Sequence, residues 1–227
     1  MHFWRLDQTI TGSGYTTDEA YLADLTAIYR QEIAALYDLG CRYVQLDEVP
    51  LIMLANPEIR ARVTAFGADP ARLISLYIES LNQALADRPP DMTAALHICR
   101  GNFKGKWLTE GGYDEIAGAV FQNVDVDGFF LEFDTQRAGG LEVLRHVPAG
   151  KRVVLGLVSS KIPQLEDLSV IRRRVEEATR YRPLESLSIS PQCGFASTVA
   201  GNPVTEEDQI EKLAALVQLA GEIWESD

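Results

Sequence analysis

Four residues of the sequence carry the side chains that zinc prefers in catalytic sites. His97 and Cys99 stand two positions apart, and Glu132 and Cys193 follow further along the chain. Zinc in enzymes binds histidine nitrogen, cysteine sulfur and carboxylate oxygen, and it keeps one position exchangeable for substrate. Residues two apart in an extended strand point to the same face, so His97 and Cys99 can approach one ion together. The set of ligand types is chemically complete.

Each of these side chains also has a purely structural interpretation. A cysteine in an apolar strand is commonly a small core residue, and a histidine there is commonly hydrogen-bonded within the core. The pair His97 and Cys99 is therefore a weak signal alone. Ligation is favoured because all three ligand types stand at the carboxyl ends of separate predicted strands, where Glu132 and Cys193 can converge with the first pair.

These positions depend on an alternation of strands and helices. Buried-strand patterns that end in polar residues recur over residues 43–46, 93–98, 128–133, 152–158 and 186–190. Helical patterns separate them, with capping boxes expected at Thr16 with Glu19 and at Thr205 with Asp208. Repeated β-then-α units with buried strands predict a parallel sheet. Functional groups at successive strand ends are typical of a TIM barrel, whereas an open doubly wound sheet binds ligands only at a switch point.

The sequence therefore predicts an α/β fold of the TIM-type (β/α)8 class, in a single domain over residues 1–227. A complete barrel has eight strands, and only five are found. The residues before Thr16 are too few to supply three more strands. We expect a partial barrel.

Composition excludes several other classes of protein. The net charge of −12 and the pI near 4.7 argue against nucleic acid as a partner, because nonspecific affinity for it comes from clustered basic residues. No apolar run approaches the length of a membrane span, and no signal-peptide pattern begins the sequence. Three scattered cysteines do not make a disulfide framework. We expect a cytoplasmic protein that makes no contact with membranes.

Four sequence blocks resemble a known family in their order and separation. These blocks are Gln45-Leu46-Asp47-Glu48, His97-Ile98-Cys99, Leu131-Glu132-Phe133 and Ser190-Pro191-Gln192-Cys193-Gly194. Over essentially its whole length the chain resembles the C-terminal catalytic barrel of cobalamin-independent methionine synthases, particularly their shorter single-barrel relatives.

The resemblance implies a zinc-dependent methyltransferase or alkyltransferase of methionine biosynthesis. Zn²⁺ would be held by the four residues named first, and Asp47 would bind the amino group of homocysteine. Glu48 is a weaker candidate for substrate binding, and its role could be limited to supporting the loop. A substrate thiol would displace Glu132, be held as a thiolate, and attack a methyl or other alkyl carbon.

The block after the fourth predicted strand departs from the family pattern. Val158 stands where methionine synthases carry a histidine that acts as an acid during methyl transfer from folate. Either the donor needs no such acid, or Ser159, Ser160 or Lys161 delivers a proton through water. A methylated folate and a non-folate donor, as in epoxyalkane:coenzyme M transferases, therefore both stay open, with Ser159 as a further substrate contact.

Aligned on these blocks, Asp47 would end strand four, so that strands four to eight are present and the first three are missing. An exposed parallel edge strand invites pairing with another chain, so we expect a homo-oligomer or a partner that completes the barrel, unless the reading frame is truncated. Other interpretations are a zinc-binding subunit inactive without that partner, a decarboxylase of the uroporphyrinogen type that needs no zinc, and a remnant without function.

Overall fold

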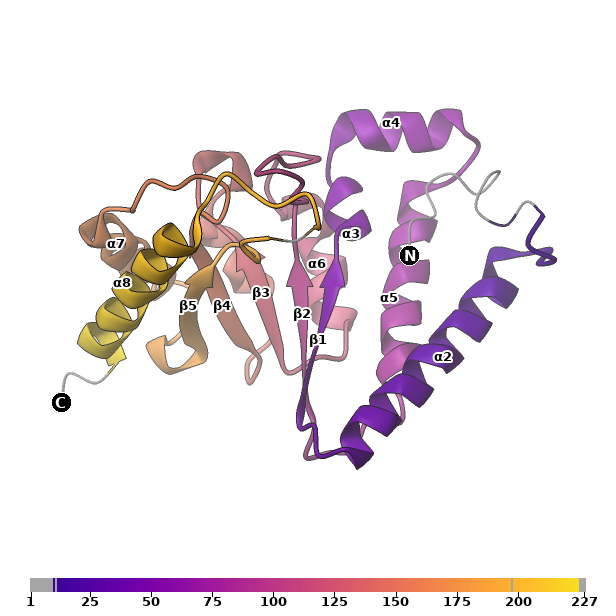
Figure 1. Ribbon diagram of the computed structural model, residues 1–227. Coiled ribbons are helices and arrows are strands. Elements are labelled where there is room, and N and C mark those ends of the chain that lie inside the picture. Colours follow the sequence, from indigo (N-terminus) through magenta and orange to yellow (C-terminus); the bar gives the residue numbers. More distant parts are fainter. Residues whose placement is uncertain (1–9, 11, 197, 225–227) are drawn as a thin grey trace.

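The computed structural model describes residues 10, 12–196 and 198–224. Within this part, five parallel strands form one sheet in the order β1-β2-β3-β4-β5 (Figure 1). The strands are β1 (Tyr43–Glu48), β2 (Thr93–Ile98), β3 (Gly128–Glu132), β4 (Arg152–Val158) and β5 (Leu187–Pro191). All five predicted strands are confirmed, with bounds that differ by at most two residues. Parallel strands in sequential order are consistent with part of a TIM-type barrel.

Helices connect the strands and cover the sheet. The α-helices are α2 (Asp18–Asp38), α3 (Pro50–Met53), α4 (Pro57–Ala65), α5 (Pro70–Leu85), α6 (Asp114–Asn123), α7 (Leu168–Ala178) and α8 (Glu206–Trp224). In the described residues, three short 3₁₀ helices accompany them: η1 (Gln136–Ala138), η2 (Leu141–His146) and η3 (Leu184–Ser186). No helix in the described part has the length and apolar content needed to cross a bilayer.

Two of the predicted helix starts can be checked against their capping bonds. The backbone N–H of Asp208 donates to Thr205 Oγ1 at 3.2 Å, and Asp208 accepts from the Thr205 backbone in return, which confirms that capping box. The box expected at Thr16 was wrong by one residue. Thr17 is the N-cap of α2, and its Oγ1 accepts from the backbone N–H of Ala20 at 3.2 Å.

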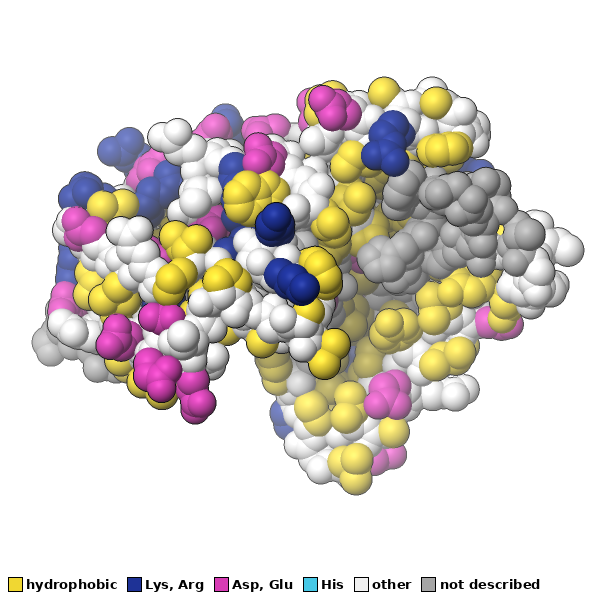
Figure 2. All heavy atoms as spheres, turned by 45° about the horizontal axis from the view of Figure 1, so that its top comes forward, with side chains coloured by type: hydrophobic (Ala, Val, Ile, Leu, Met, Phe, Trp, Pro, Cys, Tyr) yellow, Lys and Arg dark blue, Asp and Glu magenta, His cyan; other side chains and the backbone are white. Residues whose placement is uncertain are grey.

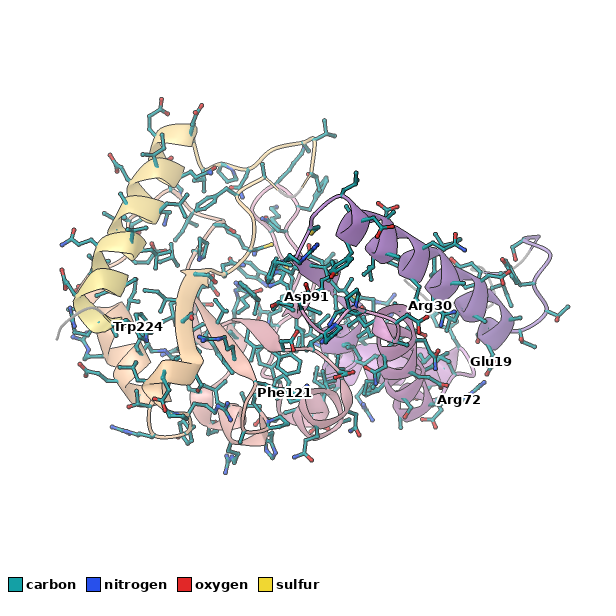
Figure 3. The ribbon with its side chains drawn as sticks, turned by 90° about the horizontal axis from the view of Figure 1, so that it is seen from below. Glu19, Arg30, Arg72, Asp91, Phe121 and Trp224 are labelled. Atoms are coloured by element: carbon teal, nitrogen blue, oxygen red, sulfur yellow. The ribbon has the colours of Figure 1, made fainter. Side chains whose placement is uncertain are left out.

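The core lies between the central strands and the helices that cover them. Leu96, Phe129 and Leu155, from β2, β3 and β4, are fully buried. Phe121 of α6, labelled in Figure 3, packs against Phe129 with ring centroids 5.0 Å apart. These central strands are apolar on the helix-facing side because parallel sheets are covered by their own crossover helices.

The edge strand β1 is less covered than the centre of the sheet. Its side chains alternate, with Tyr43, Gln45 and Asp47 exposed and the residues between them half-buried. Helix α2 extends away from the sheet beside α5, and an ion pair between Glu19 and Arg72 joins the two helices (Figure 3). Within the described residues β1 and β5 are the two edges of the sheet, so these five strands form an open sheet.

Candidate metal centre

Three of the four expected zinc ligands lie together at the carboxyl ends of their strands. The ligand atoms of His97, Cys99 and Cys193 all lie within 4.8 Å of one another. The sulfur atoms of Cys99 and Cys193 are 3.5 Å apart. All three cysteines of the chain are described, and all are thiols. Residues 94 positions apart in the sequence are thus brought to one point by the sheet.

The strand register places these side chains. His97 is the fifth residue of β2, and Cys99 follows the end of that strand, so both point to the same face. The backbone N–H of Gly101 donates to Cys99 Sγ at 3.2 Å. Cys193 follows β5 at an irregularity in its pairing with β4. A side chain at Gly156 would lie 2.8 Å from Gln192 Cα, so glycine is required for this close approach.

The chemistry of this donor set fits zinc. His97 and Cys99 are buried, and within the described residues His97 Nε2 has no hydrogen bond of acceptable geometry. Two thiolates bound to one tetrahedral zinc with bonds of ~2.3 Å lie about 3.8 Å apart, close to the observed sulfur separation. One nitrogen of the buried imidazole and the two sulfurs lie close enough together to share one cation. Two cysteines and a histidine form a known type of catalytic zinc site.

The electrostatics of the cluster reflect this crowding. The hydrogen bond to Cys193 raises the pKa of the Cys99 thiol well above its ordinary value, and burial adds to the effect. Burial lowers the pKa of His97, but the interaction with Cys193 and the charges of Asp47 and Glu132 outweigh it, so that pKa is raised. A bound divalent cation reverses this preference, because it stabilises thiolate and neutral imidazole.

Glu132, the fourth expected ligand, stands next to the cluster without belonging to it. The side chain is fully buried, and its charge acts on both His97 and Cys99. Its Oε2 accepts from the backbone N–H of Arg100 at 3.1 Å, and its Oε1 forms an ion pair with Arg137. The structure therefore brings Glu132 close to the cluster but turns its carboxylate toward an arginine.

Arg100 links the segment after β2 to the end of β3 and the residues after it. Its guanidinium is fully buried and donates five hydrogen bonds, to Tyr113 Oη and to the carbonyl oxygens of Gly111, Glu132 and Ala138. It also lies 4.5 Å from the centroid of the Tyr113 ring. Neither Arg100 nor Arg137 was expected in the site, because nothing in the sequence marks an arginine whose partners come from other segments.

The acidic pair at the end of β1 is divided between the two faces of the sheet. Asp47 lies directly opposite His97 in the register, and Gln45 Nε2 donates to its Oδ1 at 3.1 Å. Glu48 points to the helix side, where it is buried and accepts from the backbone N–H of Leu51 at 3.1 Å. Burial raises its pKa to about 7. The structure brings Asp47 to the cluster and leaves Glu48 at the start of α3.

Of the residues after β4, Ser159 faces a groove, whereas Lys161 lies next to the segment that carries Cys193. Ser159 is buried, and with Asp134 it lines a groove of about 790 Å³ between η1 and α7. Lys161 is also buried, and its Nζ donates to Gln192 Oε1 at 2.9 Å, next to Cys193. Val158 is buried and carries no titratable group. Ser159 lines this groove, and its contact with the substrate stays a prediction.

Comparisons with known proteins identify the family of the chain. Residues 8–222 match the family model described as the catalytic domain of cobalamin-independent synthase. The uncharacterized protein YxjG of Bacillus subtilis is 46% identical over 202 residues, which cover 88% of this chain and 53% of YxjG. The methionine synthase of Pyrococcus abyssi is 26% identical over 181 residues, covering 80% of this chain and 45% of that protein.

A solved structure supports the same relationship. The putative vitamin-B12 independent methionine synthase from Listeria monocytogenes is 36% identical and superposes with a TM-score of 0.71, over 91% of this chain and 56% of that one. The chain spans about half the length of the relatives it matches. The chain belongs to the catalytic-domain family of the cobalamin-independent synthases.

Proposed function

We propose that the chain is a zinc-dependent thiol alkyltransferase that methylates homocysteine or a similar thiol. The observation that carries the proposal is the convergence of His97, Cys99 and Cys193 on one point, with a buried imidazole nitrogen that lacks an aligned hydrogen bond. Relatives named methionine synthases support the same activity. In this proposal the three residues and Glu132 hold Zn²⁺, which keeps a coordinated substrate thiol as a thiolate at neutral pH.

The other residues of the site orient the substrate. Asp47 is exposed beside His97, so its carboxylate can accept hydrogen bonds from the ammonium group of an amino acid thiol. Arg100 holds the loop after β2 against the end of β3, which fixes the spacing between Cys99 and Glu132. We assign Glu48 to the support of α3, because it points away from the cluster.

The transfer itself is a displacement at carbon. The thiolate sulfur forms a bond to the methyl carbon of the donor, and the bond between that carbon and the donor breaks with its electron pair on the donor. A folate donor needs a proton on its leaving nitrogen. Val158 cannot supply one, and the polar residues that follow it in the chain are Ser159, Ser160 and Lys161. We therefore propose a methyl donor whose leaving group is stable without a proton, with methylated folate as the alternative.

Methionine formation tests this function directly. The purified chain, supplied with Zn²⁺ and homocysteine, is offered methyltetrahydrofolate and, separately, other methyl donors, and the product is followed by mass spectrometry. We expect product with at least one donor and none from a Cys193→Ala variant. A folded chain that holds zinc and methylates no thiol with any donor would contradict the proposal for the chain by itself.

A second candidate function is favoured by the open edge of the sheet. The exposed face of β1, with the half-buried Phe130 of β3 and Val154 of β4, would be covered in a closed barrel. Figure 2 shows hydrophobic side chains on the part of the molecule formed by α2 and α5, which extends away from the sheet beside β1. In this alternative, the chain binds zinc but turns over only with a partner, or a second copy, that supplies the remaining strands.

The two candidates differ in what the isolated chain does. Activity that is absent at low protein concentration and appears with association, or with the complementary part of the barrel, favours the second. Sedimentation measured beside the methylation rate separates them: turnover by a monomer contradicts the second candidate.

A further inference from the structure

The carboxylate of Glu132 lies beside the cluster of His97, Cys99 and Cys193 but is bonded elsewhere. Its Oε2 accepts from the backbone N–H of Arg100, the residue after Cys99, and its charge acts on His97 and Cys99. Its Oε1 forms an ion pair with Arg137. The carboxylate is thus held beside the cluster by an opposite charge.

Arg137 is anchored independently of Glu132. Its Nη2 donates to both carboxylate oxygens of Asp134, at 2.9 and 3.0 Å. Its guanidinium carbon lies 4.5 Å from the centroid of the Trp107 ring. These contacts keep the arginine in place, with its charge balanced by Asp134, whether or not Glu132 stays beside it.

The ion pair between Glu132 and Arg137 leaves polar atoms of both side chains unsatisfied. Within the described residues, neither Glu132 Oε1 nor Arg137 Nη1 makes a hydrogen bond of acceptable geometry. Both side chains are almost entirely buried. A buried ion pair that leaves polar atoms of both partners unsatisfied gains little over its desolvation cost, so another cation can compete with Arg137 for the carboxylate.

We propose that Arg137 is a positioning residue that draws Glu132 off the metal and so opens the fourth position to the substrate thiol. This inference rests on the proposed zinc site. An arriving thiol would lose its proton to solvent and take that position as a thiolate. Glu132 would keep its negative charge and pair with Arg137, so that one anion near the ion would replace another. Without the thiol, Glu132 would return to the ion.

Metal affinity measures this competition without any need for turnover. The dissociation constant for Zn²⁺ alone is measured on the full chain by competition with a chromophoric chelator, in the wild type, Arg137→Gln, Glu132→Gln and the double variant. We expect Arg137→Gln to bind Zn²⁺ about tenfold more tightly, because Glu132 is released to the ion. In the Glu132→Gln background the same substitution has no effect. Arg137→Lys, which keeps the charge, retains the wild-type affinity.

The thiol provides the second readout. With Co²⁺ in place of Zn²⁺, the absorption spectrum reports the ligands, and homocysteine is titrated into the loaded chain. Arg137→Gln raises the half-saturating homocysteine concentration about tenfold, since Glu132 competes more strongly for its position. Asp134→Asn is a second variant, in which Glu132 is the one acidic partner that Arg137 keeps. It weakens Zn²⁺ binding, and only while Glu132 is present.

The outcomes separate this inference from the proposed function. A wild-type chain that binds no zinc overturns both. If the wild type binds zinc but Arg137→Gln leaves the affinity unchanged or lowers it, only the role of Arg137 is overturned. A tightening that persists in the Glu132→Gln background also overturns that role, because the effect is then a general change of charge near the ion.

Discussion

The ends of β1 and β3 each carry two acidic side chains, and the two ends use them differently. At β1, Asp47 is exposed beside His97, whereas Glu48 is buried on the opposite face and caps the start of α3. At β3, Glu132 and Asp134 are both buried and share Arg137. The contrast shows that an acid at a strand end takes its role from the face it points to and from the cation within reach.

This difference follows from the positions of the strands in the sheet. β3 has neighbours on both sides, and the loop after it supplies Arg137, which forms ion pairs with both Glu132 and Asp134. Burial raises the pKa of Asp134, and the charge of Arg137 opposes that effect. β1 is an edge strand, and within the described residues no cationic side chain acts on Glu48. Burial without a cation raises a carboxyl pKa, and that is the effect found for Glu48.

Removing Arg100, which bonds to the residues after β3, should lower the stability of the chain more than any other change considered. Arg100→Ala leaves the carbonyl oxygens of Gly111, Glu132 and Ala138 without their buried donor. Each such loss costs about 1–3 kcal/mol, so we expect the free energy of unfolding to fall by about 3–5 kcal/mol. Urea denaturation measures this change.

Arg145 offers the matched control for that variant. It is exposed and donates only a local bond, to the carbonyl oxygen of Glu142 at 2.9 Å. Arg145→Ala should change stability by no more than about 0.5 kcal/mol. Equal effects from the two arginines would contradict the role given to Arg100.

The β1 side is tested by the pH dependence of stability. Glu48 keeps its proton in the folded chain up to about pH 7, whereas in the unfolded chain it loses that proton near its ordinary value of 4.5. The folded state therefore binds more protons in this window, and stability falls as pH rises through it. At about 1.4 kcal/mol per pKa unit, the loss from Glu48 approaches about 3 kcal/mol by pH 7.

Replacing Glu48 removes this dependence. Glu48→Gln can still accept from the backbone N–H of Leu51 but cannot ionise, so its stability should stay flat where that of the wild type declines. Unfolding curves recorded at pH 5, 6 and 7 for both proteins decide the matter. A parallel decline in the variant would mean that another group causes it.

The smallest expected effect concerns the exposed acid of β1. Asp47→Asn removes the charge that the proposed substrate ammonium meets, so KM for homocysteine should rise about tenfold, or ~1.4 kcal/mol. Zinc content should not change. Glu48→Gln, one residue away on the other face, should leave KM as it is, and a rise in both variants would contradict the division of roles.

Much of the fold could be predicted from the sequence, because its signals are local. The strands ending near Asp47, Cys99 and Glu132 have apolar runs bounded by polar residues, and the bounds of β2 and β4 agree with the prediction at both ends. The N-cap of α2 was misplaced because Thr16 and Thr17 are adjacent and both can cap. Only the backbone angles distinguish them.

The site could be predicted only in part, for a physical reason. Strand ends converge whatever their sequence, so His97, Cys99 and Cys193 could be placed together from the strand pattern. The partner of a charged group comes from another segment, and no local pattern reports it. The attachment of Glu132 to Arg137, and the burial of Arg100, therefore became visible only in the folded chain.

The zinc content of the purified chain tests the central claim most directly. Elemental analysis of the freshly purified wild type should give about one zinc per chain. Cys99→Ala should lose it, whereas Cys41→Ala, whose thiol bonds to the carbonyl oxygen of Tyr43 outside the cluster, should retain it. A folded wild type without zinc, or a Cys99→Ala variant that keeps its full zinc content, would contradict the account.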